Sequence, residues 1–222
     1  MLITDIFPSD GRSRIVSALS LATTGVHNSD MLIALYVKTM TIAHTGDQWV
    51  PVDTGISKVL NADTPADMLA ASYRYHGISS EQLAAEGVDE ATFKQRVEYT
   101  VSQAQCSDIL LIYGLEFLRK FLLKADTCIQ VGENVLDVTA LDRLVRSGTA
   151  VRCMRQEAGV TTRDLALACQ TVGPGTLATM RRAHGKQEPD LLVPVPEANC
   201  TFMLDLFKSW MSVNIPMITP SI

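Results

Sequence analysis

The sequence lacks closely spaced cysteines. It has five cysteines, an odd number, and no two of them form a C-x-x-C pair. Zinc sites and thiol redox motifs use thiolates at such short spacing, so the pattern argues against both kinds of site. We expect reduced, mostly buried thiols that pack as small hydrophobic side chains at Cys106, Cys128, Cys153, Cys169 and Cys200.

Long apolar runs and a basic leader are also missing. The longest apolar runs, Met31–Val37 and Ile109–Tyr113, fall far short of the roughly 20 residues that span a bilayer. The first residues, Met1–Ile6, contain Asp5 and no basic residue, unlike a secretory signal. We therefore expect an intracellular protein with no membrane partner.

The composition is that of a globular protein. Of the 222 residues, 47% are hydrophobic and 19% are charged, far from the composition of a disordered chain. Asp and Glu number 24 against 19 Lys and Arg, so the net charge is −5. This balance argues against non-specific nucleic-acid binding, which relies on positive charge. We expect a single domain over residues 1–212.

The C-terminal tail, residues 213–222, is apolar but contains two prolines. Pro216 and Pro220 prevent a regular helix there. We expect a disordered end, because chain termini usually fray. The alternative is an extended strand that docks on a partner.

Hydrophobic patterning predicts an α/β sheet of mixed direction. Three strands, expected over Ile15–Leu21, Met31–Thr45 and Trp49–Val52, are joined by short turns, which is typical of an antiparallel meander. A buried strand over Asp108–Tyr113 follows. Helices are expected over Ala66–Tyr75, after a cap at Asp89, and over Leu115–Leu123, Leu136–Val145 and Asn199–Met211. Strands followed by alternating helices and strands indicate this fold class.

Five short motifs occur along the chain in a fixed order. They lie in Ser20–Gly25, His76–Leu83, Tyr113–Leu122, Val135–Leu141 and Glu197–Thr201. In that order they resemble the motifs D-x-E-T-T-G, H-G-I-S/T-x-E-x-L, H-N-x-x-F-D-x-x-F-L, D-T-x-x-L and D-A-x-x-T of the DEDD (DnaQ-like) 3′–5′ exonuclease family. The resemblance spans about residues 15–207. It implies a ribonuclease-H-like fold in which a mixed sheet, three antiparallel strands and then parallel strands, is flanked by helices.

The resemblance implies a site for two divalent cations, about 3.5–4 Å apart, that hydrolyse phosphodiesters. Such hard cations need oxygen ligands, chiefly carboxylates. The four carboxylate positions of the family are occupied here by Ser20, Ala22, Leu118 and Glu197. A hydroxyl, a methyl and an isobutyl group thus replace three of the four ligands. We expect neither a metal site nor another cofactor.

Poorer matches to the fourth acid are Asp190 and Asp205. The resemblance places a general-base histidine five residues before that acid, where this chain has Leu192. His184 is nearby but out of register. His76, in the second motif, is expected to support a turn.

A displaced metal site could be rebuilt from Glu116, Asp137 and Glu197. Glu116 is two residues from Leu118 and so lies on a different face of its helix. Asp137 stands where the family usually opens a helix, so we expect it to act as a helix cap.

These observations predict a catalytically inactive exonuclease-fold protein that works as a protein-binding adaptor or scaffold. A phage or other viral origin would suit such a divergent copy of an enzyme fold. One alternative is a non-cleaving binder of single-stranded nucleic acid that uses the basic residues Arg181, Arg182 and Lys186. The other is a divergent metal-dependent 3′–5′ exonuclease.

Overall fold

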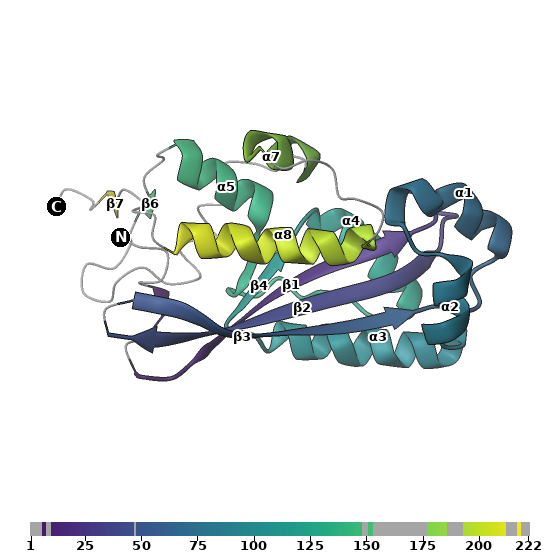
Figure 1. Cartoon of the computed structure of the whole chain (residues 1–222), viewed down its shortest axis with the longest axis horizontal. Coiled ribbons are helices and arrows are strands. Elements are labelled where there is room, and N and C mark those ends of the chain that lie inside the picture. Colours follow the sequence, from purple (N-terminus) through teal and green to yellow (C-terminus); the bar gives the residue numbers. More distant parts are fainter. Residues whose placement is uncertain are drawn as a thin grey trace.

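The computed structural model has a five-stranded sheet with helices on both faces (Figure 1). It describes residues 6–7, 10–46, 48–147, 151–152, 177–185, 193–211 and 217–218. The strands are β1 (Arg14–Thr23), β2 (Leu32–Thr45), β3 (Gln48–Leu60), β4 (Ile109–Ile112) and β5 (Val135–Asp137). Their order in the sheet is β3-β2-β1-β4-β5.

The sheet combines both strand directions. β2 pairs antiparallel with β1 and with β3, whereas β4 pairs parallel with β1 and β5 pairs parallel with β4. The predicted α/β class, with three antiparallel strands followed by parallel ones and helices around them, is confirmed at this level.

Helices cover the two faces of the sheet and create two apolar cores (Figure 1). The helices are α1 (Ala66–His76), α2 (Ser80–Glu86), α3 (Glu90–Gln105), α4 (Leu115–Leu122), α5 (Val138–Ser147), α7 (Leu177–Ala183) and α8 (Val195–Trp210), and the 3-10 turn η2 (Leu123–Ala125) follows α4. Because side chains alternate along β1, Ala18 packs in the core that includes α8 and Leu19 packs in the core that includes α3 and α4. The strand therefore lies between the two cores.

β3 is much longer than the predicted Trp49–Val52. It continues to Leu60 and forms an edge of the sheet. Pro51 is tolerated within this strand because, on an edge, its missing N–H can face away from the neighbouring strand. The register shifts beside it, so that Thr41 pairs with Asp53 and Ile42 pairs with Pro51.

Two helices begin elsewhere than predicted. The predicted helix Leu136–Val145 was wrong at its start, because the chain completes β5 before α5 begins at Val138. The last helix begins at Val195, not Asn199, with Pro194 as its N-cap and Pro196 in its first turn. Proline suits that turn because its N–H would have no helical partner there.

Part of the tail is ordered against the chain itself. Met217–Ile218 (β7) pairs in parallel with Val151–Arg152 (β6). The expectation of a disordered end was therefore wrong for these two residues. The domain boundary at residue 212 stays a prediction.

The expectation of mostly buried thiols was wrong for two cysteines. Cys106 and Cys128 are exposed free thiols, whereas Cys200 is buried. Cys153 and Cys169 lie outside the described residues. In the ranges that the structure describes, no helix has both the length and the apolarity needed to cross a bilayer.

Candidate functional site

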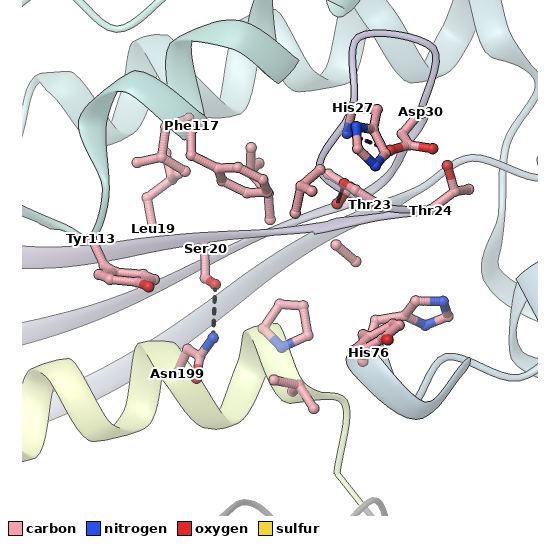
Figure 2. A pocket seen from close by; sticks show the side chains of 18 of the residues that line it. Leu19, Ser20, Thr23, Thr24, His27, Asp30, His76, Tyr113, Phe117 and Asn199 are labelled. Carbon is pink, nitrogen blue, oxygen red and sulfur yellow. Dashed lines mark hydrogen bonds between the residues drawn. The ribbon is translucent and has the colours of Figure 1, made fainter. Parts of the chain in front are cut away.

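A cavity of about 560 Å³ lies where β1 continues past β4. β1 pairs with β4 only over Val16–Ala18, and β4 ends at Ile112, level with Leu19, so the pairing does not continue along Leu19–Thr23. All five of these residues line the cavity (Figure 2). The short β4 therefore creates the space, and β1 forms one of its walls.

The other walls come from four parts of the chain that are far apart in sequence. The segment from β4 into α4 and the helix α8 face each other across β1 in Figure 2, and α1 and the loop after β1 close the far end. Further lining residues are Thr24, Gly25, Val26, His27, Asp30, Tyr75, His76, Tyr113, Phe117, Leu118, Val195, Pro196, Asn199 and Met203.

Three of the four positions that the family resemblance singles out meet in this cavity. Ser20, Ala22 and Leu118 all line it, and they are 8%, 2% and 2% exposed. Ser20 and Ala22 come from alternate positions of β1, whereas Leu118 comes from α4. The structure thus brings together residues almost 100 positions apart, and none of the three side chains carries a charge.

The fourth position, Glu197, is not part of the lining. Its helix presents Asn199 instead, whose Nδ2 donates to Ser20 Oγ over 3.5 Å (Figure 2). The Glu197 carboxylate acts on the side of α8 that faces β2: burial, followed by the charge of Glu197, raises the pKa of Tyr36. The position matched in sequence, Glu197, therefore lies on the same helix as the cavity-lining Asn199 but is not the residue that faces β1.

These residues do not fit a pair of divalent cations. Ser20 offers one neutral oxygen, and Ala22 and Leu118 offer none, whereas such cations need several carboxylates. Across the described residues, no group of three or more His, Cys, Asp or Glu side chains is placed to hold a metal ion.

The acids considered for a rebuilt site are engaged elsewhere. Glu116 is 89% exposed and pairs with Arg119 over 3.6 Å. Asp137 caps α5, as expected, because its Oδ1 accepts from Thr139 N over 2.9 Å. Its Oδ2 accepts from Gly114 N over 3.2 Å. Neither carboxylate lines the cavity.

The poorer matches are not gathered at the cavity either. Asp205 pairs with Lys208 over 3.1 Å on the exposed side of α8. Asp190 and Leu192 lie outside the described residues. His184 Nε2 is 2.7 Å from Asp142 Oδ1, away from the lining.

Asp142 is a buried acid that the sequence analysis did not single out. It is 1% exposed. Its Oδ1 lies 2.7 Å from Nε2 of His184, which follows α7, and its Oδ2 lies 2.8 Å from Nε of Arg146, one turn further along α5. The spacing of Asp142 and Arg146 was visible as an i, i+4 pair. No local pattern pointed to His184, which is 42 positions away.

Of the three basic residues proposed to contact nucleic acid, the structure places the side chain of one. Arg181 is 8% exposed. Its Nη2 donates to Asn199 Oδ1 over 2.8 Å, and its guanidinium lies 4.8 Å from the ring centre of Phe202. It is thus an interior residue that holds Asn199. The Arg182 side chain and Lys186 lie outside the described part of the chain.

His76 is neutral and supports the end of α1. Its Nδ1 accepts from Ile78 N over 2.9 Å, so Nε2 carries the proton and faces Ser72 Oγ at 3.0 Å. Burial lowers its pKa to about 4. Gly77 follows with φ +67°, the left-handed conformation that favours glycine after a helix. This arrangement agrees with the expected role in a turn.

The loop after β1 is tied to α4 and η2 by two lysines. Lys120 Nζ donates to the carbonyl of Val26, and Lys124 Nζ donates to the carbonyls of Asn28 and Asp30. Since Val26 and Asp30 line the cavity, these contacts fix one of its walls.

The cavity is almost free of charge. Its described lining contains one carboxylate, that of Asp30, and neither lysine nor arginine. Asp30 Oδ2 accepts from His27 N over 2.5 Å, so the carboxylate is partly engaged by its own loop. Its polar lining groups include the hydroxyl and amide groups of Ser20, Tyr113 and Asn199 (Figure 2).

Comparisons with protein-family models, with curated proteins and with solved structures found no match to this chain.

Proposed function

We propose that the protein is a catalytically inactive chain of the DnaQ-like exonuclease type, with a ribonuclease-H-like fold, that acts inside the cell as an adaptor for a protein partner. One observation carries the proposal. Ser20, Ala22 and Leu118, identified by motif matching alone, line a single cavity. At these positions the resemblance leads us to expect metal ligands, yet none of the three side chains is a carboxylate, and the described lining contains only one carboxylate, that of Asp30.

The sheet supports the proposed fold. Three antiparallel strands come first, and β4 and β5 then pair in parallel beside β1. This is the arrangement that the resemblance implies. The matched residues also lie at the carboxyl end of β1 and at the start of the helix after β4, where the family motifs require them.

Exposed apolar residues continue from the cavity to the surface and favour a protein partner. Val26 and Tyr75 line the cavity and are 66% and 60% exposed. Arg74 lies 4.6 Å above the Tyr75 ring centre and holds it in place. Exposed apolar residues at the mouth of a cavity are a common feature of interaction sites.

The same surroundings speak against the nucleic-acid alternative. Phosphodiesters are bound chiefly by lysine and arginine. Neither type is found in the described lining, and Arg181 is directed inward onto Asn199. Oligonucleotide binding that weakens with salt would nevertheless favour that alternative.

A nuclease assay tests the loss of chemistry. End-labelled single-stranded DNA and RNA are incubated with the full chain and Mn²⁺ or Mg²⁺, with and without chelator. We expect no release of nucleotides. Turnover that the chelator abolishes would overturn the proposal and establish the divergent exonuclease instead.

Site-specific photocrosslinking tests the adaptor role. A photoreactive residue replaces Val26 or Tyr75, and Val131, which is 46% exposed and outside the lining, serves as the matched control. We expect one cross-linked protein from both rim positions and none from the control. Equal labelling from all three positions, or cross-links to nucleic acid, would contradict the proposal.

A further inference from the structure

We infer, on the basis of the proposed adaptor function, that the cavity receives an extended peptide segment of the partner. The segment inserts one large uncharged side chain, and its backbone carbonyl accepts a hydrogen bond from Asn199 Nδ2. Four features of the described lining lead to this ligand chemistry.

The first feature is the fixed orientation of the Asn199 amide. Arg181 Nη2 donates to Asn199 Oδ1 over 2.8 Å, which occupies the acceptor end of the amide. A flipped amide would turn its NH₂ group against a guanidinium, where two donors would face each other. Arg181 is therefore a positioning residue, and Asn199 presents a donor to the cavity.

That donor has capacity to spare. Nδ2 carries two protons, and its contact with Ser20 Oγ is long, at 3.5 Å. Ser20 is only 8% exposed, so a ligand group that reaches the pair leaves bulk water. A carbonyl oxygen matches this donor, whereas a second donor such as an ammonium group does not.

The second feature is that none of the described lining residues carries a positive charge that could directly contact an anionic ligand. The described lining has no lysine or arginine, and its one carboxylate is Asp30. Burying a phosphate or carboxylate without a partner is costly. An uncharged side chain between Tyr113, Phe117 and Met203 meets no such cost and gains apolar contact. The volume, about 560 Å³, is within the range of about 300–1,000 Å³ typical of ligand cavities.

The third feature is the free edge of β1, which favours a peptide over a small molecule. Ser20–Thr23 pair with β2 on one side, and on the other side the pairing with β4 ends at Ala18. Backbone groups of alternate residues along such an edge are directed outward. Extended peptides recognise edges of this kind through main-chain hydrogen bonds and place alternate side chains in pockets.

The fourth feature is the exposed rim. Val26 and Tyr75 stand at the same cavity and are largely exposed. They offer apolar surface outside the buried part of the cavity, so the site suits a segment longer than a single residue.

Binding of short probes to the full chain tests this inference. Chemical-shift or saturation-transfer NMR compares the uncharged peptide acetyl-Ala-Phe-Ala-amide with its phosphotyrosine counterpart, with thymidine monophosphate and with MnCl₂. We expect the uncharged peptide to bind and to perturb residues of the lining, and the charged probes to bind at least about tenfold more weakly.

Two variants locate the contact. Asn199→Asp keeps the shape of the side chain but replaces the donor by an acceptor, and should weaken peptide binding about tenfold. Gln95→Glu makes the same amide-to-acid change on an exposed residue of α3 outside the lining and should leave binding unchanged. Arg181→Gln should weaken binding by a smaller factor, because Asn199 remains but is no longer held. Thermal unfolding of each variant confirms that it is folded.

The outcomes separate this inference from the proposed function. Peptide binding that Asn199→Asp does not weaken, or no probe binding at all, overturns the inference; cross-links from Val26 and Tyr75 to a protein would then still support the adaptor. Preferential binding of thymidine monophosphate or Mn²⁺ in the cavity overturns both.

Discussion

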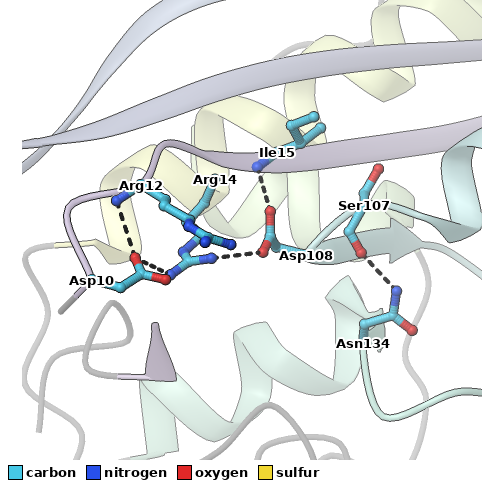
Figure 3. Close-up of polar contacts among 7 residues, drawn as sticks. All are labelled: Asp10, Arg12, Arg14, Ile15, Ser107, Asp108 and Asn134. Carbon is cyan, nitrogen blue, oxygen red and sulfur yellow. Dashed lines mark hydrogen bonds and ion pairs between the residues drawn. The ribbon is translucent and has the colours of Figure 1, made fainter. Parts of the chain in front are cut away.

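The two ends of β1 differ in how they are held. At the amino end, Arg14 pairs with Asp10 over 2.5 Å and with Asp108 over 3.5 Å, and Ile15 N donates to Asp108 Oδ2 over 2.8 Å (Figure 3). At the carboxyl end, Ser20 and Ala22 face a cavity with a single carboxylate in its described lining. The amino end of β1 is thus held by ion pairs and a hydrogen bond, whereas its carboxyl end lines a mostly uncharged cavity.

Further hydrogen bonds near the start of β4 stabilise the amino end of β1. Ser17 Oγ and Ser107 Oγ are 2.6 Å apart and buried. Asn134 Nδ2 donates to the carbonyl of Ser107 over 2.8 Å (Figure 3). It also donates to the carbonyl of Gln105 over 3.0 Å, and so ties the segment before β5 to the turn before β4. The contrast implies that the amino end of β1 contributes to stability, whereas its carboxyl end is available for binding.

The largest effect is expected from placing a charge at the cavity end. Leu118→Asp buries a carboxylate at a position that is 2% exposed, and should lower the free energy of unfolding by about 3–5 kcal/mol. Urea unfolding at pH 7 measures it. Leu118→Asn is the neutral control, and the difference between the two variants isolates the charge. Equal stability of Leu118→Asp and the natural chain would show that this end is wetter than described.

Placing acids at all three matched positions tests the cavity end further. The combined variant Ser20→Asp, Ala22→Glu, Leu118→Asp should unfold easily without metal and regain part of its stability with Mn²⁺, because the three positions meet in one cavity. No response to Mn²⁺, in a variant that is still folded at low temperature, would contradict the matching of these positions to a metal centre.

The next largest effect is a dependence of the free energy of unfolding on pH, which we expect from His76 in the cavity wall. In the unfolded chain, a histidine takes up a proton near pH 6.5, whereas buried His76 does so only at about pH 4. Between these values the unfolded state binds more protons, so the free energy of unfolding falls with decreasing pH. The loss between pH 7 and pH 5 is expected to be about 2 kcal/mol.

His76→Gln is the variant that tests this pH dependence. It should be less stable overall but should change less between the two pH values in urea unfolding. Parallel curves for the two proteins would assign the pH dependence to other groups.

A smaller effect is expected at the amino end of β1. Asp108→Asn weakens the acceptor of Ile15 N and removes the ion pair with Arg14. Because the Asp108 side chain is 34% exposed, the cost should be about 1 kcal/mol in urea unfolding. Asp205→Asn, which breaks an exposed pair with Lys208, is the control and should cost less. A larger loss of stability in Asp205→Asn than in Asp108→Asn would contradict the stabilising role of the contacts at the amino end of β1.

The smallest effect on stability is expected at the rim. Val26→Ser changes a side chain that is 66% exposed, and should alter the free energy of unfolding by no more than about 0.5 kcal/mol. Binding of the uncharged peptide should nevertheless weaken. A loss of stability with unchanged binding would identify Val26 as a structural residue.

Local patterns in the sequence predicted the elements that determine the fold. β1 and β2 are rich in apolar and β-branched residues, and α3 has its cap at Asp89 and its buried face at Phe93 and Val97 as expected. β3 was underestimated because the polar residues and the glycine that follow Val52, in 53–55, are typical of a turn, whereas the strand continues along the sheet edge to Leu60.

The site was predictable in part. The motifs led to Ser20, Ala22 and Leu118, which do meet. Asn199 could not be found by motif matching, because the matched acid position, Glu197, lies on another side of the same helix. Arg181 and Asn199 are 18 positions apart and lie on different helices, α7 and α8. No short sequence pattern indicates that they are in contact.

The lysine contacts to the loop after β1 bear on the speed of binding. Because Lys120 and Lys124 hold the carbonyls of Val26, Asn28 and Asp30, the loop has little conformational freedom left to lose when a partner arrives. Preorganisation of this kind lowers the entropic cost of association. It also removes a slow rearrangement step, so association should be limited by encounter and orientation, and differences among partners should appear mainly in their dissociation rates.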